Sequence, residues 1–139
     1  MNCVICQKYS SQSLIIAELD GITLTHLLPS PDGFAMRGRL VIEPKRHVVA
    51  PEDLSPQEFS QMGMLLQKGM TLLKNALGAE HVYFFRINDQ VPHFHFHLVP
   101  RYPETPKDFW GLKIIDWPKY PKANVAEINE LSELLRERT

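Results

Sequence analysis

Several features that would assign the chain to a class at once are scarce or missing. It has two cysteines and a net charge of −1 at pH 7, which argues against a disulfide-rich secreted scaffold and a basic nucleic-acid or membrane-surface binder. No apolar run approaches the roughly 18 residues of a membrane span, and the N-terminus lacks signal-peptide character. We therefore expect a cytoplasmic protein with reduced cysteines, no membrane partner and no dedicated nucleic-acid binding.

The sequence does contain enough apolar material for one core. Its 139 residues are 44% hydrophobic, which fits a single domain over residues 1–139. Alternating and β-branched stretches, with Asp20-Gly21 as a hairpin turn, predict five strands. Their expected ranges are 13–19, 22–28, 38–44, 81–87 and 93–99.

Two helices are predicted by their caps and apolar spacing. Ser55 and Glu58 form a capping-box pattern, and Gly78 fits the left-handed cap that ends the helix after Leu77. The expected buried face consists of Phe59, Met62, Leu66, Met70, Leu73 and Leu77. Asn124 caps a second helix near the C-terminus. The predicted fold class is α+β, with a mainly antiparallel sheet of about five strands, one long helix and a C-terminal helix.

A proline-rich stretch separates the last strand from the C-terminal helix. It runs over residues 102–122 and contains both tryptophans, Trp110 and Trp117. This is long for a connection without secondary structure in a compact domain. We expect the C-terminal extension 102–139 either to pack its aromatic side chains on the surface or to cover a site.

Three of the six histidines alternate with apolar residues in His93-Phe94-His95-Phe96-His97-Leu98-Val99. On a strand, alternate side chains point to opposite faces, so the imidazoles would form one row and the apolar side chains would enter the core. Imidazole serves as nucleophile, acid, base and metal ligand near neutral pH. We therefore expect this row to carry the function.

The two cysteines form a second motif, Cys3-Val4-Ile5-Cys6. This spacing allows two thiolates to reach one zinc ion. A redox pair is an alternative, although such pairs normally open a helix after a strand. Two surface cysteines without a role are the third interpretation, and the motif alone does not choose among them.

Taken together, these motifs resemble the histidine triad family of nucleotide hydrolases and transferases. The histidine row matches the family's His-φ-His-φ-His-φ-φ motif, in which φ is apolar, and Pro100-Arg101-Tyr102 continues as in many members. Residues 40–47, the capped helix 55–77 and the cysteine pair also agree in order, so the resemblance spans residues 3–102. It implies a purine nucleotide substrate and a homodimer.

The resemblance implies a structural zinc ion held by Cys3, Cys6, His47 and His93. Two sulfur and two nitrogen ligands saturate a tetrahedral zinc and leave no position for water. Such a site would tie the N-terminus, residues 3–6, to the sheet and would fix the first histidine of the row.

The resemblance also assigns the chemistry. The middle histidine, His95, would attack the α-phosphorus of a nucleoside 5′-phosphate derivative, such as a phosphoramidate or a dinucleoside polyphosphate, and form a covalent nucleotidyl-histidine. His97, as a cationic imidazole, would contact the α-phosphate and donate toward the leaving group. Asn88 matches an asparagine that reaches the ribose or phosphate side of the nucleotide.

The chain departs from the family pattern around this site. A serine that often touches the phosphate is absent, and Gln90 is the nearest polar substitute for substrate binding. Gly38-Arg39 stands where most members have Gly-His, so Arg39 is either a phosphate ligand or a solvent-facing side chain. Asp32 is the nearest candidate for the acid that binds ribose hydroxyls.

Two other functions compete with this one. His93, His95 and His97 could instead hold a catalytic metal in a hydrolase, but the cysteine set would then lack its fourth ligand. The chain could also be a non-catalytic nucleotide-binding module that keeps the fold. A purely structural row of three imidazoles is a further, less specific interpretation.

Overall fold

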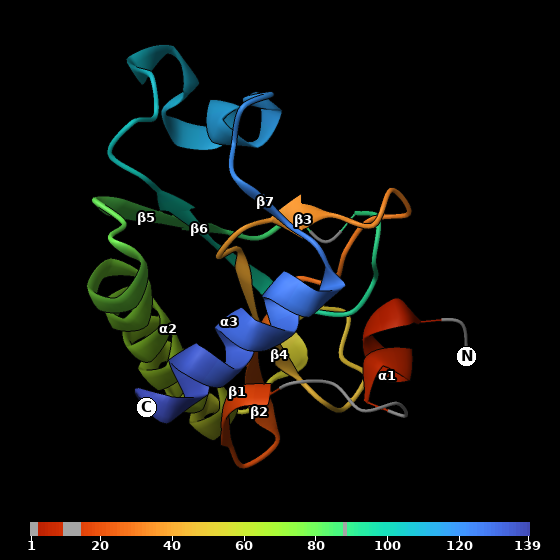
Figure 1. Cartoon of the computed structure of the whole chain (residues 1–139). Helices are drawn as coiled ribbons and strands as arrows, with labels where there is room; N and C mark the ends of the chain where they lie inside the picture. Colours follow the sequence, from red (N-terminus) through yellow and green to blue (C-terminus); the bar gives the residue numbers. More distant parts are fainter. Residues whose placement is uncertain (1–2, 10–14, 88) are drawn as a thin grey trace.

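A five-stranded antiparallel sheet forms the centre of the molecule (Figure 1). The structure, a computed structural model, describes residues 3–9, 15–87 and 89–139. The sheet order is β1-β2-β4-β6-β5, with β1 at Ile15–Leu19, β2 at Ile22–His26, β4 at Leu40–Pro44, β6 at Phe96–Arg101 and β5 at His81–Phe85. The prediction of an α+β fold with about five antiparallel strands is confirmed.

The two long helices follow the predicted caps. Helix α2, Pro56–Leu77, begins after Ser55, which forms the capping box with Glu58, and ends at Gly78 with φ 74°. Helix α3, Val125–Glu137, begins after Asn124, which forms a second capping box with Glu127. Among the described residues, no helix combines the length and hydrophobicity needed to cross a bilayer.

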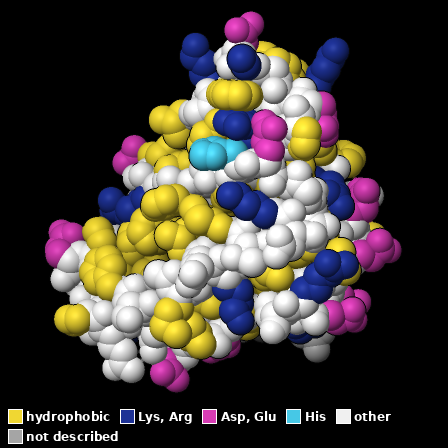
Figure 2. Space-filling view, turned by 90° about the vertical axis from the view of Figure 1, so that its left-hand side faces the viewer, with side chains coloured by type: hydrophobic (Ala, Val, Ile, Leu, Met, Phe, Trp, Pro, Cys, Tyr) yellow, Lys and Arg dark blue, Asp and Glu magenta, His cyan; other side chains and the backbone are white. Residues whose placement is uncertain are grey.

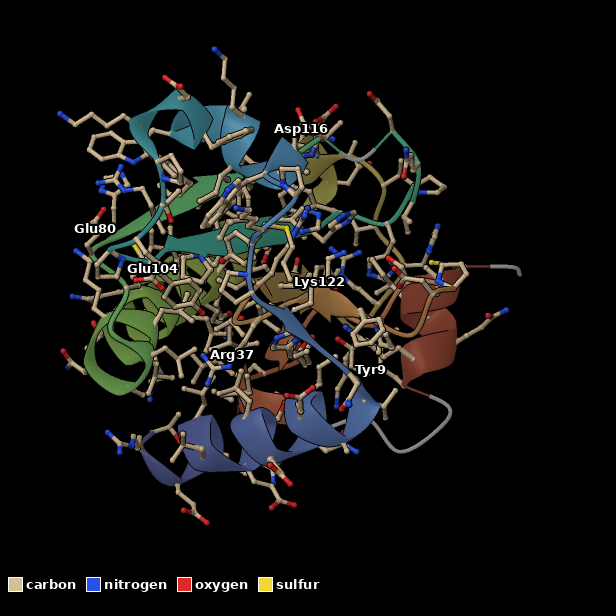
Figure 3. All side chains as sticks on the ribbon, turned by 45° about the horizontal axis from the view of Figure 1, so that its top comes forward. Tyr9, Arg37, Glu80, Glu104, Asp116 and Lys122 are labelled. Atoms are coloured by element: carbon tan, nitrogen blue, oxygen red, sulfur yellow. The ribbon has the colours of Figure 1, made fainter. Side chains whose placement is uncertain are left out.

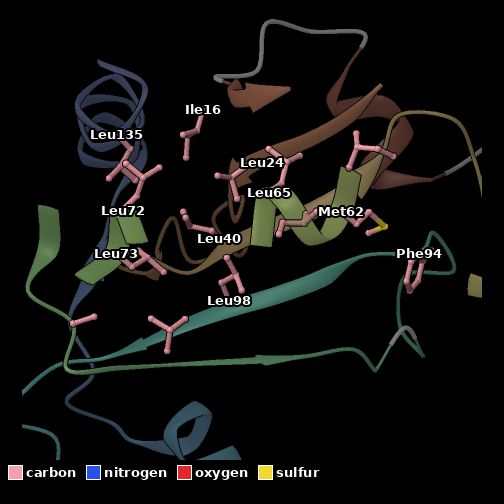
Figure 4. Close-up of a cluster of buried hydrophobic side chains, with 14 of the residues drawn as sticks. Ile16, Leu24, Leu40, Met62, Leu65, Leu72, Leu73, Phe94, Leu98 and Leu135 are labelled. Carbon is pink, nitrogen blue, oxygen red and sulfur yellow. The ribbon is translucent and has the colours of Figure 1, made fainter. Parts of the chain in front are cut away.

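Helices α2 and α3 cover one face of the sheet, and the main core lies between that face and the two helices. Leu40, Ile42 and Leu98 of the central strands meet Leu65 of α2 and Leu135 of α3 there (Figure 4). All five side chains are at most 1% exposed. The expected apolar row is therefore correct, since Phe94 and Leu98 are buried and Phe96 packs against the same cluster.

The buried face of α2 matches the predicted one except at Phe59, which is 44% exposed. The other five predicted residues are buried or pack against the core. Leu65 and Leu72 are buried in addition. The helix lies close to the sheet at Gly69, where a Cβ atom would be 2.6 Å from a methyl group of Leu98.

The opposite face of the sheet is covered by shorter segments. The first helix, α1 at Val4–Lys8, lies over one part of it, and residues 102–122 of the C-terminal extension lie over another (Figure 1). The extension contains the 3-10 helices η2, Lys107–Phe109, and η3, Gly111–Asp116; a third, η1, spans Pro51–Asp53 before α2. Val99, Ile114 and Tyr120 form a second small core beneath the extension, with Trp117 packed against it.

A small second sheet links the extension to the middle of the chain. Strand β3, Ala35–Met36, pairs antiparallel with β7, Lys122–Ala123. Neither strand was expected, since two-residue pairings leave no periodic pattern in a sequence. Figure 3 shows Arg37 and Lys122 on these neighbouring segments.

The triad strand is shorter than predicted at its start. Strand β6 begins at Phe96 rather than at His93, and it extends to Arg101. His93 and Phe94 precede the strand, and the Phe94 N–H donates to the Val48 carbonyl in the segment after β4. The ladder between β4 and β6 ends at the pair of Ile42 with Phe96.

Candidate functional site

The four predicted zinc ligands come together from three distant parts of the chain. Cys3 and Cys6 are at the start of α1 and one turn later, His47 follows β4, and His93 precedes β6. Their ligand atoms, among the described residues, all lie within 4.8 Å of one another. The Cys6 Sγ atom is 3.3 Å from His47 Nδ1 and 3.4 Å from His93 Nδ1, and Cys3 Sγ is 3.6 Å from His93 Nδ1.

These distances fit one zinc ion. Zinc–sulfur and zinc–nitrogen bonds of about 2.3 and 2.0 Å at the tetrahedral angle give a sulfur–nitrogen edge of about 3.5 Å. His93 Nε2–H donates to the Pro44 carbonyl at 2.7 Å, which leaves Nδ1 unprotonated toward the sulfur atoms. Burial is the main cause of the lowered pKa of His93. The donor set and its tautomer are therefore those of a saturated zinc site.

His95 is joined to this cluster through the backbone. Its Nδ1–H donates to the His93 carbonyl at 2.5 Å. The proton is thus held on Nδ1, and Nε2 keeps its lone pair. His95 is 7% exposed, and it lines a cavity of about 590 Å³. In the neutral tautomer that this hydrogen bond favours, Nε2 carries the lone pair that a nucleophile needs.

His97 lies beside His95 on the same face of the sheet. Their ring centroids are 4.8 Å apart, and His97 also stacks on Phe85 at 5.4 Å. Arg39 Nε–H donates to His97 Nδ1 at 3.2 Å, so the His97 proton is on Nε2. Burial first, then Arg39 and His95, lower the pKa of His97 to about 3.

One sequence-based expectation about His97 is therefore corrected. Its imidazole is a neutral Nε2–H donor in the free protein, not the expected cation, because burial disfavours the charged ring and the neighbouring guanidinium opposes a second positive charge. The fixed positive charge of this site belongs to Arg39, which lines the cavity. Of the two alternatives for Arg39, the solvent-facing one does not fit its place in the cavity wall, and its role as a phosphate ligand stays a prediction.

Of the three remaining predicted residues, one lines the cavity, one lies outside the described residues and one lies away from the cavity. Gln90 lines the cavity together with Asp89. Asn88 lies outside the described residues. Asp32 is wrong as a ribose ligand, since it is exposed, accepts from the Phe34 N–H at 3.0 Å and does not line the cavity. It serves a local turn instead.

The tryptophans of the extension do not line the cavity. Trp117 packs in the second core, and Trp110 lies under the Arg101 guanidinium at 3.7 Å from its ring centroid. Ile115 is the residue of the extension that reaches the cavity wall. The extension thus mainly packs its aromatic residues on the surface and contributes one apolar side chain to the site.

Sequence reasoning missed a buried polar cluster in the cavity wall. Lys8 of α1 forms an ion pair with Glu43 of β4 and donates to Thr25 Oγ1 at 2.9 Å. Tyr9, labelled in Figure 3 beside α1, donates to Glu43 at 2.6 Å. Glu43 is fully buried, and its Oε2 atom has no hydrogen-bond partner among the described residues. The sequence did contain a signal for this cluster, because Glu43 is a charged residue directly after the three apolar strand residues Leu40-Val41-Ile42.

His26 also has a role that its position in a strand did not indicate. Its Nδ1–H donates to the Leu27 carbonyl at 2.8 Å, and its Nε2 accepts from the Gly38 N–H at 3.0 Å. Burial lowers the pKa of His26 and keeps it neutral. It therefore holds the turn that presents Arg39.

Comparison with solved structures finds many with this architecture. A Hit-like protein from Bartonella henselae matches with a TM-score of 0.71 and 17% identity over 99% of this chain and 96% of that one. A Zn-bound histidine triad family protein from Mycobacterium smegmatis matches with a TM-score of 0.67 and 22% identity over 99% and 92%. A hypothetical histidine triad nucleotide-binding protein from Sulfolobus tokodaii matches with a TM-score of 0.71 and 14% identity over 97% and 90%.

Sequence comparison alone gives no match. No family model matches the chain, and no curated protein does either. At these identities the structural likeness establishes the architecture, and the spacing of His93, His95 and His97 supplies the motif. The chain has the fold of the histidine triad family, as its sequence indicated.

Proposed function

We propose that the protein is a nucleotidyl hydrolase or transferase that acts on the α-phosphate of nucleoside 5′-phosphate derivatives. The observation that carries this proposal is the state of His95, whose Nδ1–H is held by the His93 carbonyl. A lone pair on Nε2 at the wall of a cavity is the requirement for attack on phosphorus. Purine nucleotides are the proposed substrates.

In the proposed first step, His95 Nε2 forms a bond to the α-phosphorus while the bond from phosphorus to the leaving group breaks. His97 Nε2–H donates a hydrogen bond to the leaving atom, which takes any proton it needs from solvent water. A second water then attacks the nucleotidyl-histidine and loses a proton to solvent, which releases the nucleoside monophosphate and frees His95. Splitting one displacement in two lowers each barrier, and Arg39 offsets the charge on the phosphoryl oxygens. Gln90, and Asn88 by resemblance, are proposed substrate contacts.

The zinc ion is proposed as a structural cofactor. Cys3, Cys6, His47 and His93 would hold it, and it would supply cross-linking of α1 to the sheet rather than a reactive water. The fit of the sulfur–nitrogen distances supports this assignment. It also weakens the alternative of a three-histidine metal hydrolase, because His93 Nδ1 faces the cysteines.

The test is turnover of adenosine and guanosine phosphoramidates and dinucleoside polyphosphates by wild type and His95→Ala. We expect turnover by wild type alone, and intact-mass detection of a nucleotide adduct that His97→Ala stabilises. Unchanged turnover in His95→Ala would refute the nucleophile assignment. Nucleotide binding without any turnover would instead favour the non-catalytic module.

A homodimer and a cytoplasmic location remain predictions. Strand β5 is an edge of the sheet, and its Phe84 is 52% exposed. Figure 2 shows hydrophobic side chains gathered on the side of the molecule that carries α2 and β5. Light scattering coupled to size-exclusion chromatography tests the dimer, with Phe84→Glu as the variant expected to give monomers.

A further inference from the structure

Arg39 is a partly buried cation without an anionic partner in the described part of the chain. Its Nε–H donates to His97 and its Nη1–H to Met36 Sδ at 3.3 Å. Its Cζ atom lies 5.6 Å from the centroid of the Phe85 ring. An imidazole, a thioether and an aromatic face carry no net charge, so none of these contacts neutralises the guanidinium.

Four other cations of the described residues have a carboxylate partner within 3.0 Å. These pairs are Lys8–Glu43, Lys45–Glu18, Arg46–Glu58 and Arg101–Glu80. Withdrawing a charge from water without a partner is costly, so an uncompensated cation in a cavity wall favours an anionic ligand. Burial lowers the pKa of Arg39 from its usual value, because removing the charged guanidinium from water disfavours its protonated form.

The backbone holds Arg39 in place before any ligand binds. Its N–H donates to the Met36 carbonyl at 3.1 Å, and its carbonyl accepts from the Leu27 N–H at 2.8 Å. The neighbouring Arg37 N–H donates to the Pro121 carbonyl at 2.8 Å. A side chain fixed at both ends loses little entropy when it binds an anion.

We propose that Arg39 binds oxygens of the phosphate chain and makes the site select substrates whose leaving group itself carries phosphates. This inference rests on the proposed function, because it concerns the leaving group of that reaction. A guanidinium pairs with phosphate oxygens through two N–H groups at once. The leaving group of a phosphoramidate is an amine, which a fixed cation does not attract. The leaving group of a dinucleoside polyphosphate is a nucleotide with several negative charges.

Arg39 also acts as a positioning residue for His97. By donating to Nδ1 it leaves the proton on Nε2, and this N–H is the group that donates a hydrogen bond to the leaving atom in the proposed reaction. The two roles are separable by experiment. Loss of the tautomer, or of the charge that offsets the α-phosphoryl oxygens, affects every substrate, whereas loss of the contact to the phosphates of the leaving group affects only substrates whose leaving group carries them.

The first experiment measures binding of inorganic tripolyphosphate by calorimetry at fixed ionic strength. Arg39→Met should weaken binding about tenfold or more, since a charge-assisted pair is lost, and Arg39→Lys should recover part of it. Arg37→Met is the matched control, because it removes the same charge two residues away, outside the cavity lining. Equal affinities of wild type and Arg39→Met, or an equal loss in Arg37→Met, would overturn the proposal.

The second experiment compares kcat/KM for a diadenosine polyphosphate and an adenosine phosphoramidate. In Arg39→Met the ratio of the two should fall about tenfold, and in Arg39→Lys it should fall less. An equal fall for both substrates would leave only the positioning role and overturn the selectivity. If wild type turns over neither substrate, the proposed function fails, while tripolyphosphate binding still decides whether Arg39 is an anion ligand.

Discussion

Two histidine clusters lie side by side in this protein, and they differ in what is left unsatisfied. At His93 both ring nitrogens are committed, one to the Pro44 carbonyl and one to the cysteine sulfur atoms. At His95 and His97 one nitrogen of each ring is held, by a carbonyl and by Arg39 respectively. The other nitrogen of each has no protein hydrogen bond among the described residues.

The difference shows how one residue type serves two purposes within five positions. We call the cluster around His93 closed, because both of its ring nitrogens have protein partners and it can serve only to stabilise the fold. We call the pair of His95 and His97 open, because one ring nitrogen of each has no protein partner among the described residues and can react with a ligand. The His93 residue joins the two, since its ring belongs to the first and its carbonyl to the second.

The largest expected effect comes from removing the open nitrogen of His95. His95→Ala should lower kcat by about 10⁴-fold or more, because no other group can form the covalent intermediate. Zinc content by elemental analysis should stay equal to that of wild type, as His95 is not in the cysteine cluster. Loss of zinc from this variant would break the separation of the two clusters.

Opening the closed cluster should have the reverse outcome. Cys6→Ser should lose zinc and lower Tm by about 10 °C or more, because metal binding is coupled to the free energy of folding. Well below the new Tm, kcat should fall less than about tenfold, since no step needs the metal. His81→Ala, a histidine outside both clusters, is the control. A loss of kcat comparable to that of His95→Ala would contradict this assignment.

The next effect is on pH dependence, through His97. Its pKa is about 3 in the folded state and about 6.5 in the unfolded chain. The unfolded chain therefore binds the proton more tightly, and the stability is full above pH 6.5 and decreases as the pH falls toward 3, by at most about 1.4 kcal/mol per pH unit. Urea unfolding from pH 7 to 5 should show a shallower dependence in His97→Gln than in His81→Gln. Parallel curves would contradict the neutral state of His97.

The smallest effect concerns the turn beside Arg39. Gly38 has φ +85°, and a Cβ atom there would lie 2.5 Å from the Tyr102 hydroxyl, which donates to the Arg37 carbonyl. Gly38→Ala should cost about 1–3 kcal/mol of stability and lower kcat/KM several-fold without loss of zinc. Gly33→Ala, at φ +89° with open space around it, is the matched control. Equal effects of both would show that the space at Gly38 is unimportant.

Parts of this arrangement were predictable because they depend on local chemistry. The caps at Ser55 and Asn124 need only residues within one turn, and both are present. The grouping of Cys3, Cys6, His47 and His93 came from resemblance to a known motif, since no local pattern links residues so far apart in the chain.

Other parts depend on packing that a sequence does not display. The close approach of α2 to the sheet at Gly69 involves Leu98 of a distant strand, and the pairing of Lys8 with Glu43 needs α1 to lie on β4. Arg39 had two open interpretations because its environment combines Met36, Phe85 and His97 from three elements. The charge state of His97 then depends on Arg39, so it could not be predicted before Arg39 was placed.

The pairing of β3 with β7 has a consequence for which parts of the chain each site needs. The zinc ligands, helix α2 and all five strands of the main sheet lie at or before Arg101. The turn beside Arg39 has part of its backbone hydrogen bonding from residues 121–123. The metal cluster and the main sheet can therefore be assembled from residues up to Arg101, whereas the finished anion site also needs the segment that follows them.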